Sequence, residues 1–376
     1  MKLSLRALQL DAAASRGRRY PELPHPYRDE FQRDRDRIVH ARAFRRLEDK
    51  TQVFPPALSD HFRNRLTHTI EVAQIARTAA AALDLNPELT EALALAHDIG
   101  HPPFAHAGEE ELNRQMQRYG GRFDHNLHAL RIVEHFEQRY ARFPGLNLTF
   151  EVREGIVKHS RDLAPGEFPE LDEYLPGLRP PLEAQLIDLA DEIAYNTADL
   201  DDAFSAGLFT LEEAAAAVPY FGRILEEVDT QFPGAAERIR FLEALRLLID
   251  LLVGGLIEGT YAAATGAGVS SVDQARAYPR RLAVLTPDAA ATASALKGFL
   301  HRRVYCSEPL QQERSRVTAQ LAELFEFFMR DPGQLPEAYR QQAAAEELPR
   351  VVCDYIAGMT DGFFRRTYER IFKHGR

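Results

Sequence analysis

The sequence is poor in cysteine and lacks a long uninterrupted apolar run. Its two cysteines, Cys306 and Cys353, form neither a disulfide framework nor a metal-binding motif, which is typical of a reducing cytoplasm. The most apolar stretch, residues 241–261, is interrupted by charged side chains and therefore predicts a mostly buried helix, not a membrane span. Residues 1–19 contain no apolar segment typical of an export signal. We therefore expect a cytoplasmic protein with no membrane partner.

Acidic residues are in excess, but charge is unevenly distributed along the chain. The formal net charge is −10, yet residues 1–50 hold 13 Lys and Arg against 8 Asp and Glu. This basic N-terminal arm therefore carries 13 − 8 = +5, which leaves about −15 for the remainder. The acidic remainder argues against a protein that coats DNA. The basic arm could contact the phosphates of a ligand or partner, or it could be a solvated face.

Apolar residues recur at helical spacing through most of the chain, whereas period-two alternation is almost absent. Stretches rich in proline and glycine separate the helical segments, and the longest of these is residues 161–182. The best strand candidate, residues 146–152, is short. The pattern predicts an all-α protein, a single extended helical domain with peripheral helices. The clearest helical segments are residues 65–83, 90–101, 128–141, 181–204 and 315–329.

The stretch ALALAHDIGHPPFAHAGEEEL, residues 92–112, places several polar groups at the end of an apolar helix. Pro102 disfavours the helical conformation for its predecessor, so we expect this helix to end at His101. His97 and His101 would then lie four residues apart on one face. The small alanines before them would let a second helix come close. The segment therefore predicts a site shared with neighbouring helices.

Two further polar residues on apolar helices complete a set of ligands. The helix expected at residues 64–82 carries His68, and the helix at 181–204 carries Asp191. With His97 and Asp98, they provide two imidazoles and two carboxylates, which suit Mn²⁺, Fe²⁺, Zn²⁺ or Mg²⁺. A lone helical histidine is more often a core or surface group. The recurrence of such groups on apolar helices favours a metal site, because unpaired charges there would be costly.

Beyond the double proline, His106 and Glu109 lie three residues apart, and His125 follows in RFDHNLHAL. A carboxylate at this spacing can orient a histidine that acts as a general acid or base. A zinc protease also carries two histidines four residues apart on a helix. Here Asp98 follows the first histidine where a protease needs a glutamate, so this alternative fails at its most diagnostic position.

These motifs resemble those of the HD-domain superfamily, whose H…HD…D pattern matches the four ligands above. More narrowly, the chain is similar to the deoxyguanosine triphosphate triphosphohydrolase-like enzymes, most specifically in AFRRLEDKTQVF and HDIGHPPFAHAGE. The resemblance implies one helical domain over residues 1–376: an HD core at about 60–205, the basic arm 1–50 and a C-terminal helical region 206–376. The similar segments are residues 26–54, 63–77, 97–112, 123–134, 190–203 and 352–361.

The resemblance implies hydrolysis of dGTP, and of other dNTPs, at the α-phosphorus to give a deoxynucleoside and inorganic triphosphate. The implied cofactor is a divalent metal ion, Mn²⁺ or Mg²⁺ first, with Fe²⁺, Co²⁺ and Zn²⁺ as alternatives. Its implied ligands are His68, His97, Asp98 and Asp191.

The resemblance also assigns roles around the substrate. His106 and Glu109 match the catalytic acid/base pair, and His101 and His125 match histidines that face the phosphates. Arg65 and Lys297 match residues that bind phosphate, and Gln52 and Asp199 match residues that contact the sugar 3′-hydroxyl. Val53 and Tyr305 match residues that crowd the 2′ position and so exclude ribonucleotides. Tyr195 is expected to form a wall of the pocket.

Two departures from the family pattern leave base preference, allosteric control and assembly open. Ala198 stands where many relatives carry histidine, and MTDGFF at residues 359–364 lacks the usual Arg-Tyr after the aspartate. Such enzymes commonly form homo-oligomers, so we expect an oligomer. They often bind a nucleotide at a second site, so a dNTP is a candidate effector, and the basic arm leaves single-stranded nucleic acid open as another. Two alternatives remain: an HD-type phosphodiesterase or nucleotidase acting on other nucleotides, and a nucleotide-sensing or nucleic-acid-binding regulator.

Overall fold

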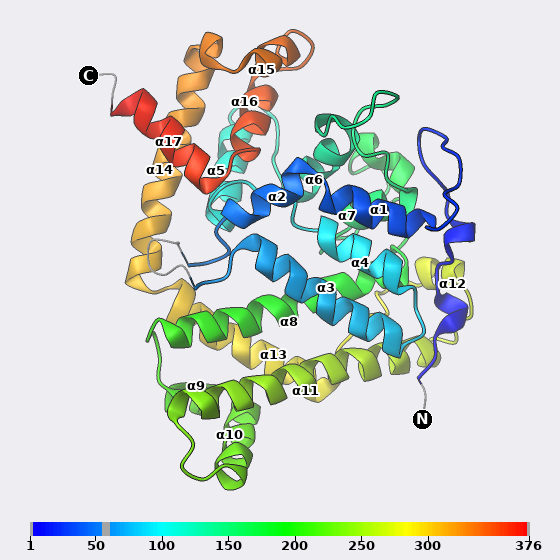
Figure 1. The fold of residues 1–376 in the computed structure, drawn as a ribbon, viewed down its shortest axis with the longest axis vertical. Coiled ribbons are helices and arrows are strands. Elements are labelled where there is room, and N and C mark those ends of the chain that lie inside the picture. Colours follow the sequence, from blue (N-terminus) through cyan, green and yellow to red (C-terminus); the bar gives the residue numbers. More distant parts are fainter. Residues whose placement is uncertain (1–2, 55–60, 374–376) are drawn as a thin grey trace. The chain divides into compact units, whose positions relative to one another are not determined.

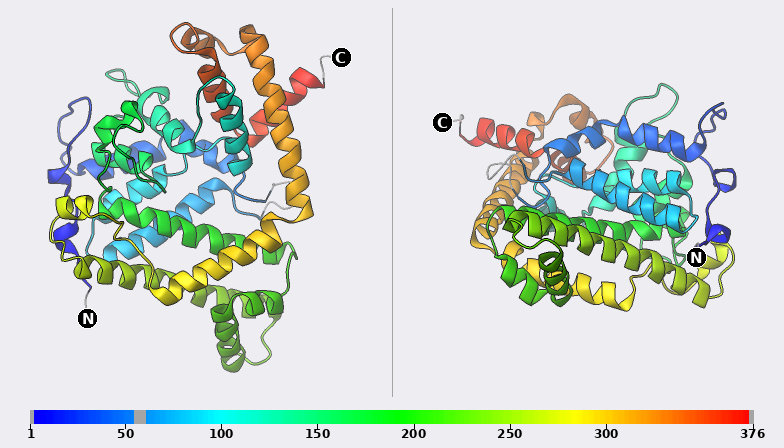
Figure 2. Two further views of the ribbon diagram at one scale, coloured as in Figure 1. Left: turned by 180° about the vertical axis from the view of Figure 1, so that it is seen from behind. Right: turned by 60° about the horizontal axis from the view of Figure 1, so that its bottom comes forward.

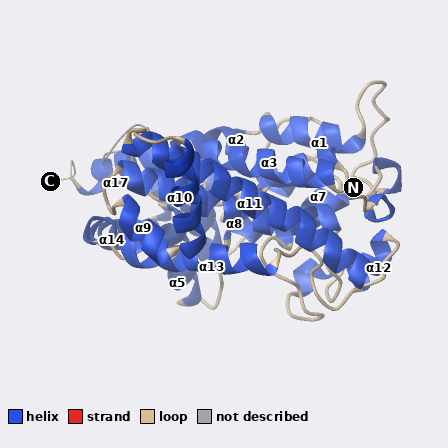
Figure 3. Ribbon diagram, turned by 90° about the horizontal axis from the view of Figure 1, so that it is seen from below, coloured by secondary structure: helices blue, strands red, loops and turns tan. Residues whose placement is uncertain are grey.

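The computed structural model describes residues 3–54 and 61–373 and shows an all-α protein. The described residues contain helices and loops with only isolated β-bridges, as Figure 3 shows. The prediction of an all-α fold is confirmed. Among the described residues, no helix is both long and apolar enough to cross a membrane.

Contacts divide the chain into two compact units, each assembled from separate segments. The first unit contains Met1–Arg35, His68–Ala94 and Thr149–Ser307, and the second contains Asp36–Thr67, Leu95–Leu148 and Glu308–Arg376. The unit boundaries fall within three helices, namely α1 (Glu30–Val39), α3 (Arg65–Ala82) and α4 (Pro87–Ala96). The boundaries predicted for the HD core, the basic arm and the C-terminal region stay predictions.

The first unit is built around long helices that pack along one another. In Figures 1 and 2, α8 (Leu182–Ser205), α11 (Glu237–Gly266) and α13 (Pro287–Leu300) run side by side, and each pair is in contact. Gly255 allows α13 to approach α11, because a Cβ added at Gly255 would lie 2.3 Å from the Cβ of Ala289. The remaining helices of this unit are α7 (Phe150–Val157), α9 (Leu211–Ala217), α10 (Pro219–Gln231) and α12 (Val272–Ala277).

The second unit packs around α14 (Glu308–Arg330), which contacts both α5 (Ala105–Gln117) and α16 (Leu348–Ala357) (Figure 2). Leucine and phenylalanine side chains such as Leu112 and Phe325 form its core, and burial of each contributes roughly 1.5–3 kcal/mol. The remaining α-helices are α2 (Arg42–Arg46), α6 (His125–Arg131), α15 (Glu337–Gln342) and α17 (Asp361–Phe372).

Three local predictions need correction. The helix expected to end at His101 ends at Ala96, because i→i+3 bonds from Ile99 to Ala96 and from His101 to Asp98 replace helical ones. The strand candidate 146–152 forms no strand, because α7 begins within it. The helix expected over 128–141 ends with the π-helix Ile132–Phe136. The proline-rich segment 161–182 is irregular as predicted, apart from one short 3₁₀-helix.

Candidate active site

The first unit contains a group of residues that we call the first half-site, of which all but His159 were predicted from the sequence: His68, His159, Asp191, Tyr195, Asp199, Lys297 and Tyr305. His68 lies on α3 and Asp191 on α8, and the distance from His68 Nε2 to Asp191 Oδ1 is 2.9 Å. His68 is buried, whereas the Asp191 side chain is about one-fifth exposed. The helix pair therefore brings one imidazole and one carboxylate of the predicted ligand set together.

Asp191, Tyr195 and Asp199 follow one another at four-residue spacing along α8, so they share a face of that helix. The Tyr305 hydroxyl donates to Asp199 Oδ2 at 2.5 Å. Burial raises the pKa of Tyr305, and the nearby Asp199 carboxylate raises it further, so this phenol stays protonated.

Lys297, which is more than half exposed, lies over the same face of α8. Its Nζ lies 3.8 Å from Glu192 Oε1. Desolvation alone would lower the pKa of Lys297, but the Tyr195 hydroxyl and the carboxylates of Glu192 and Asp191 raise it above its ordinary value. The first half-site therefore combines a phenol–carboxylate pair with a permanently charged ammonium group.

The second unit contains the second half-site: Arg65, His97, Asp98, His101, His106, Glu109 and His125. The tight turns after α4 place His97 and Asp98 side by side, with 3.5 Å between His97 Nε2 and Asp98 Oδ1. Asp98 also faces His101 Nε2 at 3.0 Å and Arg65 Nη1 at 2.5 Å. Arg65, assigned to phosphate from the resemblance, thus contacts a predicted metal ligand.

The charges of this cluster are fixed by burial and by Arg65. Burial alone would raise the pKa of Asp98, but Arg65, His97 and His101 lower it well below its usual range. Burial lowers the pKa of His101, and the Arg65 charge lowers it further. Asp98 is therefore ionised and His101 neutral at ordinary pH, which are the protonation states in which such side chains can bind a metal ion.

Beyond the double proline, two imidazoles lie beside Glu109 on α5, and the His101 ring packs against both of them. Glu109 Oε1 accepts from the His125 backbone N–H and lies 2.8 Å from His125 Nδ1, whereas Glu109 Oε2 lies 3.6 Å from His106 Nδ1. The His101 ring stacks on His125 at 3.9 Å and meets His106 edge-on at 5.5 Å. Glu109 thus lies closer to His125 than to its predicted partner His106, whose side chain is 78% exposed.

The pKa of Glu109 reflects these two imidazoles. Burial alone would raise it, but the nearby His106 ring and the hydrogen bond to His125 lower it well below its ordinary value. Glu109 is therefore a fixed negative charge between two rings that can carry protons. Such a carboxylate can orient imidazoles for general acid–base chemistry.

Residues 100–104, which we call the connector, join the predicted metal ligands His97 and Asp98 to the predicted acid/base pair His106 and Glu109. Three buried side chains hold connector backbone atoms. Lys50 donates to the His101 carbonyl oxygen, the His128 ring bonds the Gly100 carbonyl oxygen through Nδ1 at 2.8 Å, and Asp361 Oδ1 accepts from the Phe104 N–H at 3.0 Å. Asp361 Oδ2 also accepts from the N–H of Thr51 at 3.0 Å.

Sequence reasoning missed these three residues and also His159. Lys50 and Asp361 lie inside segments recognised as similar to the family, but no spacing rule relates them to residues 100–104. His159 lies directly after α7, and its Nε2 is 3.8 Å from Asp191 Oδ2. Their roles depend on contacts between distant parts of the chain, which periodicity does not reveal.

Gln52 and Val53 lie in the second unit just before residues 55–60, which the structure does not describe. Both are half-buried, and the Gln52 amide oxygen is buried without a hydrogen-bond partner among the described residues. Of the predicted substrate contacts, the structure thus gathers Tyr195, Asp199, Lys297 and Tyr305 in one unit. It places Arg65 beside Asp98 in the other.

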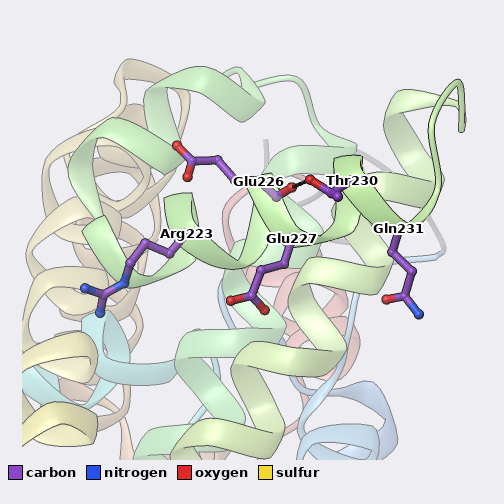
Figure 4. Close-up of a pocket in the computed structure, with 5 residues that line it drawn as sticks. All are labelled: Arg223, Glu226, Glu227, Thr230 and Gln231. Atoms are coloured by element: carbon purple, nitrogen blue, oxygen red, sulfur yellow. Dashed lines mark hydrogen bonds between the residues drawn. The ribbon is translucent and has the colours of Figure 1, made fainter.

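A recess of about 450 Å³ lies elsewhere, along α10 (Figure 4). Its lining side chains all come from that helix, and Thr230 donates to the Glu226 carbonyl oxygen of its own helix. None of the predicted site residues lines it. The recess therefore adds nothing to the candidate site. Its lining residues are Arg223, Glu226, Glu227, Thr230 and Gln231.

Comparison with known proteins identifies two family models that match this chain. The HD domain family model matches residues 65–196, and the phosphohydrolase-associated domain model matches residues 283–370. A solved structure of a hypothetical protein from Aquifex aeolicus is 17% identical in sequence to this chain, and the match covers 91% of this chain and 71% of that one. Its TM-score of 0.41 carries no structural inference.

Three curated relatives carry the name deoxyguanosinetriphosphate triphosphohydrolase-like protein. The one from Ralstonia nicotianae is 47% identical over 96% of this chain and 92% of its own. The relative from Azoarcus sp. is 46% identical over 99% of this chain and 98% of its own. The relative from Geobacter sulfurreducens is 45% identical over 96% of this chain and 92% of its own. The chain therefore belongs to the deoxyguanosinetriphosphate triphosphohydrolase-like family of HD-domain proteins.

Proposed function

We propose that this protein is a metal-dependent dNTP triphosphohydrolase. It would hydrolyse dGTP, and other dNTPs, at the α-phosphorus to a deoxynucleoside and inorganic triphosphate. The observation that carries the proposal is 45–47% identity over 96–99% of the chain to relatives named for this activity. At such similarity the two half-sites, with all four residues of the H…HD…D pattern, support the same chemistry.

The residues present fit a divalent metal ion. His68 and Asp191 in the first half-site and His97 and Asp98 in the second supply the two imidazoles and two carboxylates that Mn²⁺ or Mg²⁺ would accept, with Fe²⁺, Co²⁺ and Zn²⁺ as alternatives. We propose that these four side chains hold one ion. When bound, such an ion neutralises phosphate charge and lowers the pKa of a water molecule.

The acid/base part of the second half-site would provide the proton transfer. Cleavage at the α-phosphorus on the nucleoside side expels a sugar alkoxide, a poor leaving group that needs a proton. His106 is solvent-exposed and beside ionised Glu109, so it could deliver this proton, and general acid help is worth about 10²–10⁴-fold. His125, bound by the same carboxylate and stacked on neutral His101, would face the phosphates.

The remaining contacts would select and hold the substrate. Lys297 and Arg65 supply positive charge for the triphosphate. The hydrogen-bonded Tyr305–Asp199 pair would read the sugar, with Asp199 accepting from the 3′-hydroxyl and Tyr305 filling the 2′ position. Gln52, Val53 and Tyr195 keep the roles expected from the resemblance. We further propose a cytoplasmic homo-oligomer with a dNTP effector, and the basic arm leaves single-stranded nucleic acid as a second effector.

The product of the reaction tests the proposal directly. The protein is incubated with Mn²⁺ or Mg²⁺ and each dNTP, alone and in mixtures, and the products are separated by anion-exchange chromatography. Inorganic triphosphate and deoxynucleoside in equal amounts are the expected result. Orthophosphate or pyrophosphate in their place would favour the phosphodiesterase or nucleotidase alternative. Binding without turnover would favour a nucleotide-sensing regulator.

A further inference from the structure

Asp191 faces a different imidazole with each of its carboxylate oxygens. Oδ1 lies 2.9 Å from His68 Nε2, and Oδ2 lies 3.8 Å from His159 Nε2. His159 follows α7 and belongs to neither the H…HD…D pattern nor any substrate contact expected above. We infer that His159 is a further ligand of the divalent metal ion, an inference that rests on the proposed metal-dependent function.

The separation between His159 Nε2 and Asp191 Oδ2 suits a shared ion better than a hydrogen bond. Protein N–H···O hydrogen bonds span about 2.7–3.2 Å, so 3.8 Å is too long for one. Nitrogen and oxygen ligands lie about 2.0–2.2 Å from their metal ion, which puts two ligand atoms about 3–4 Å apart. The measured distance falls within that range.

The other ring nitrogen of His159 lies close to a second carboxylate. His159 Nδ1 lies 2.9 Å from Asp188 Oδ1, and the same oxygen accepts from the Ser160 N–H at 2.9 Å. Ser160 adopts a left-handed conformation with φ of 54°, which a residue other than glycine seldom does. Metal-bound histidines usually present the second ring N–H to a carboxylate, which fixes the ring and leaves Nε2 for the metal.

Asp188 is itself paired with a cation, Arg281. Arg281 pairs with Asp188 Oδ2 and donates to the carbonyl oxygens of Lys158 at 2.8 Å and Arg161 at 2.5 Å. Arg281 therefore binds the loop after α7 and the carboxylate together. The series Arg281–Asp188–His159 has the order of an outer shell, an orienting carboxylate and a ligand. The His159 side chain is 5% exposed, so it is shielded from bulk water.

Metal binding by the full chain, measured without nucleotide, tests this inference. Mn²⁺ affinity is determined by calorimetry on metal-stripped protein, and Co²⁺ coordination is followed by the visible absorption band. For His159→Gln we expect roughly tenfold or weaker Mn²⁺ binding and an altered Co²⁺ band. The control His301→Gln, an exposed histidine of the same unit, should retain the parent affinity and spectrum.

The choice of glutamine separates a ligand from a hydrogen-bonding residue. The glutamine amide reaches the position of Nε2 and can donate to Asp191, but it is a poor ligand for these ions. Parent-like Mn²⁺ affinity in His159→Gln would therefore overturn the inference. If this variant unfolds at room temperature, Asp188→Asn replaces it. Loss of the orienting carboxylate should weaken Mn²⁺ binding by about 10–100-fold, and no weakening would equally overturn the inference.

The outcome is separable from that of the product assay. If the parent binds metal through His159 but releases orthophosphate, the proposed function fails and this inference stands. If triphosphate is released and His159→Gln binds Mn²⁺ like the parent, only this inference fails. A parent that binds no divalent ion refutes the inference, and the product assay then decides the function by itself.

Discussion

At the scale of single residues, the proposed function divides the second half-site into metal ligands and proton carriers. Asp98 is buried beside Arg65 and two histidines, whereas His106 is exposed and touches Glu109. We predict that Asp98→Ala loses bound metal and turnover together. We expect His106→Ala to keep its metal and to lower kcat by about 10²–10⁴-fold. Metal content by mass spectrometry and initial rates would check both. Equal metal loss in the two variants would contradict this division.

Tyr305 is the residue on which discrimination against ribonucleotides should depend. Its hydroxyl is tied to Asp199, so its ring has a fixed position on the α8 face. Tyr305→Ala should raise kcat/KM for GTP relative to dGTP, and the roughly 1–3 kcal/mol typical of a small steric difference corresponds to about 10–200-fold. Tyr305→Phe, which keeps the ring, is the control and should retain discrimination. Unchanged selectivity in the alanine variant would remove Tyr305 from this role.

Lys50 gives the second unit a defined dependence of stability on pH. Burial, followed by the charges of Arg46 and Arg65, lowers its pKa from 10.5 to about 7. Between pH 7 and pH 10.5 the Lys50 amine binds more protons in the unfolded chain than in the folded one. Lys50 therefore makes the free energy of unfolding rise as pH increases through this range. Across that window the parent should gain up to about 1.4 kcal/mol per pH unit relative to Lys50→Met. If the denaturation midpoints of the parent and of Lys50→Met changed equally from pH 7 to 9, this role of Lys50 would be contradicted.

At the scale of elements, the approach of α6 to the connector depends on Gly100. A Cβ at this position would lie 2.0 Å from the His125 carbonyl oxygen and 2.4 Å from the Ala129 nitrogen. Gly100→Ala should therefore destabilise the protein by roughly 1–3 kcal/mol and displace His125. The control is Gly254→Ala in α11, where no atom lies within 4 Å and helix propensity should give a gain of about 0.5–1 kcal/mol. Thermal unfolding of both variants would check the opposite signs.

Asp361 is the first residue of α17. Its carboxylate accepts hydrogen bonds from the Thr51 N–H and from the Phe104 N–H of the connector, so it holds these two backbone segments together. Asp361→Asn should lower kcat by up to about 10²-fold with little change in KM, because misplacing His101 and His106 affects chemistry more than binding. Glu183→Gln is a matched control. It is a buried carboxylate of the other unit that accepts from Leu10 and Asn86 N–H groups. If Asp361→Asn and Glu183→Gln lowered kcat equally, the effect of Asp361 would be explained by stability alone.

At the scale of the whole molecule, the four proposed metal ligands are divided between the two compact units, with His68 and Asp191 in the first and His97 and Asp98 in the second. If the two half-sites hold one ion, Asp191→Ala and Asp98→Ala should each abolish tight Mn²⁺ binding. A chelator should then raise the exposure of both half-sites to proteolysis. Metal titration of the two variants would check this expectation, with Asp201→Ala, near the end of α8, as a control that keeps binding. Retention of the ion by either variant would mean that one unit binds it alone.

The sequence by itself determined the helical class and the positions of several long helices, and it indicated the chemistry proposed for the site. Apolar periodicity is a local property, so it located α3, α8 and α14, and the residue types of the H…HD…D pattern indicated a metal ion. The rule that a helix ends just before a proline predicted that this helix would continue to His101. The structure ends α4 at Ala96 and follows it with i→i+3 turns. Only the tertiary structure decided that Glu109 serves His125 and that His159 lies beside Asp191, because such contacts join segments whose approach depends on packing and not on spacing along the chain.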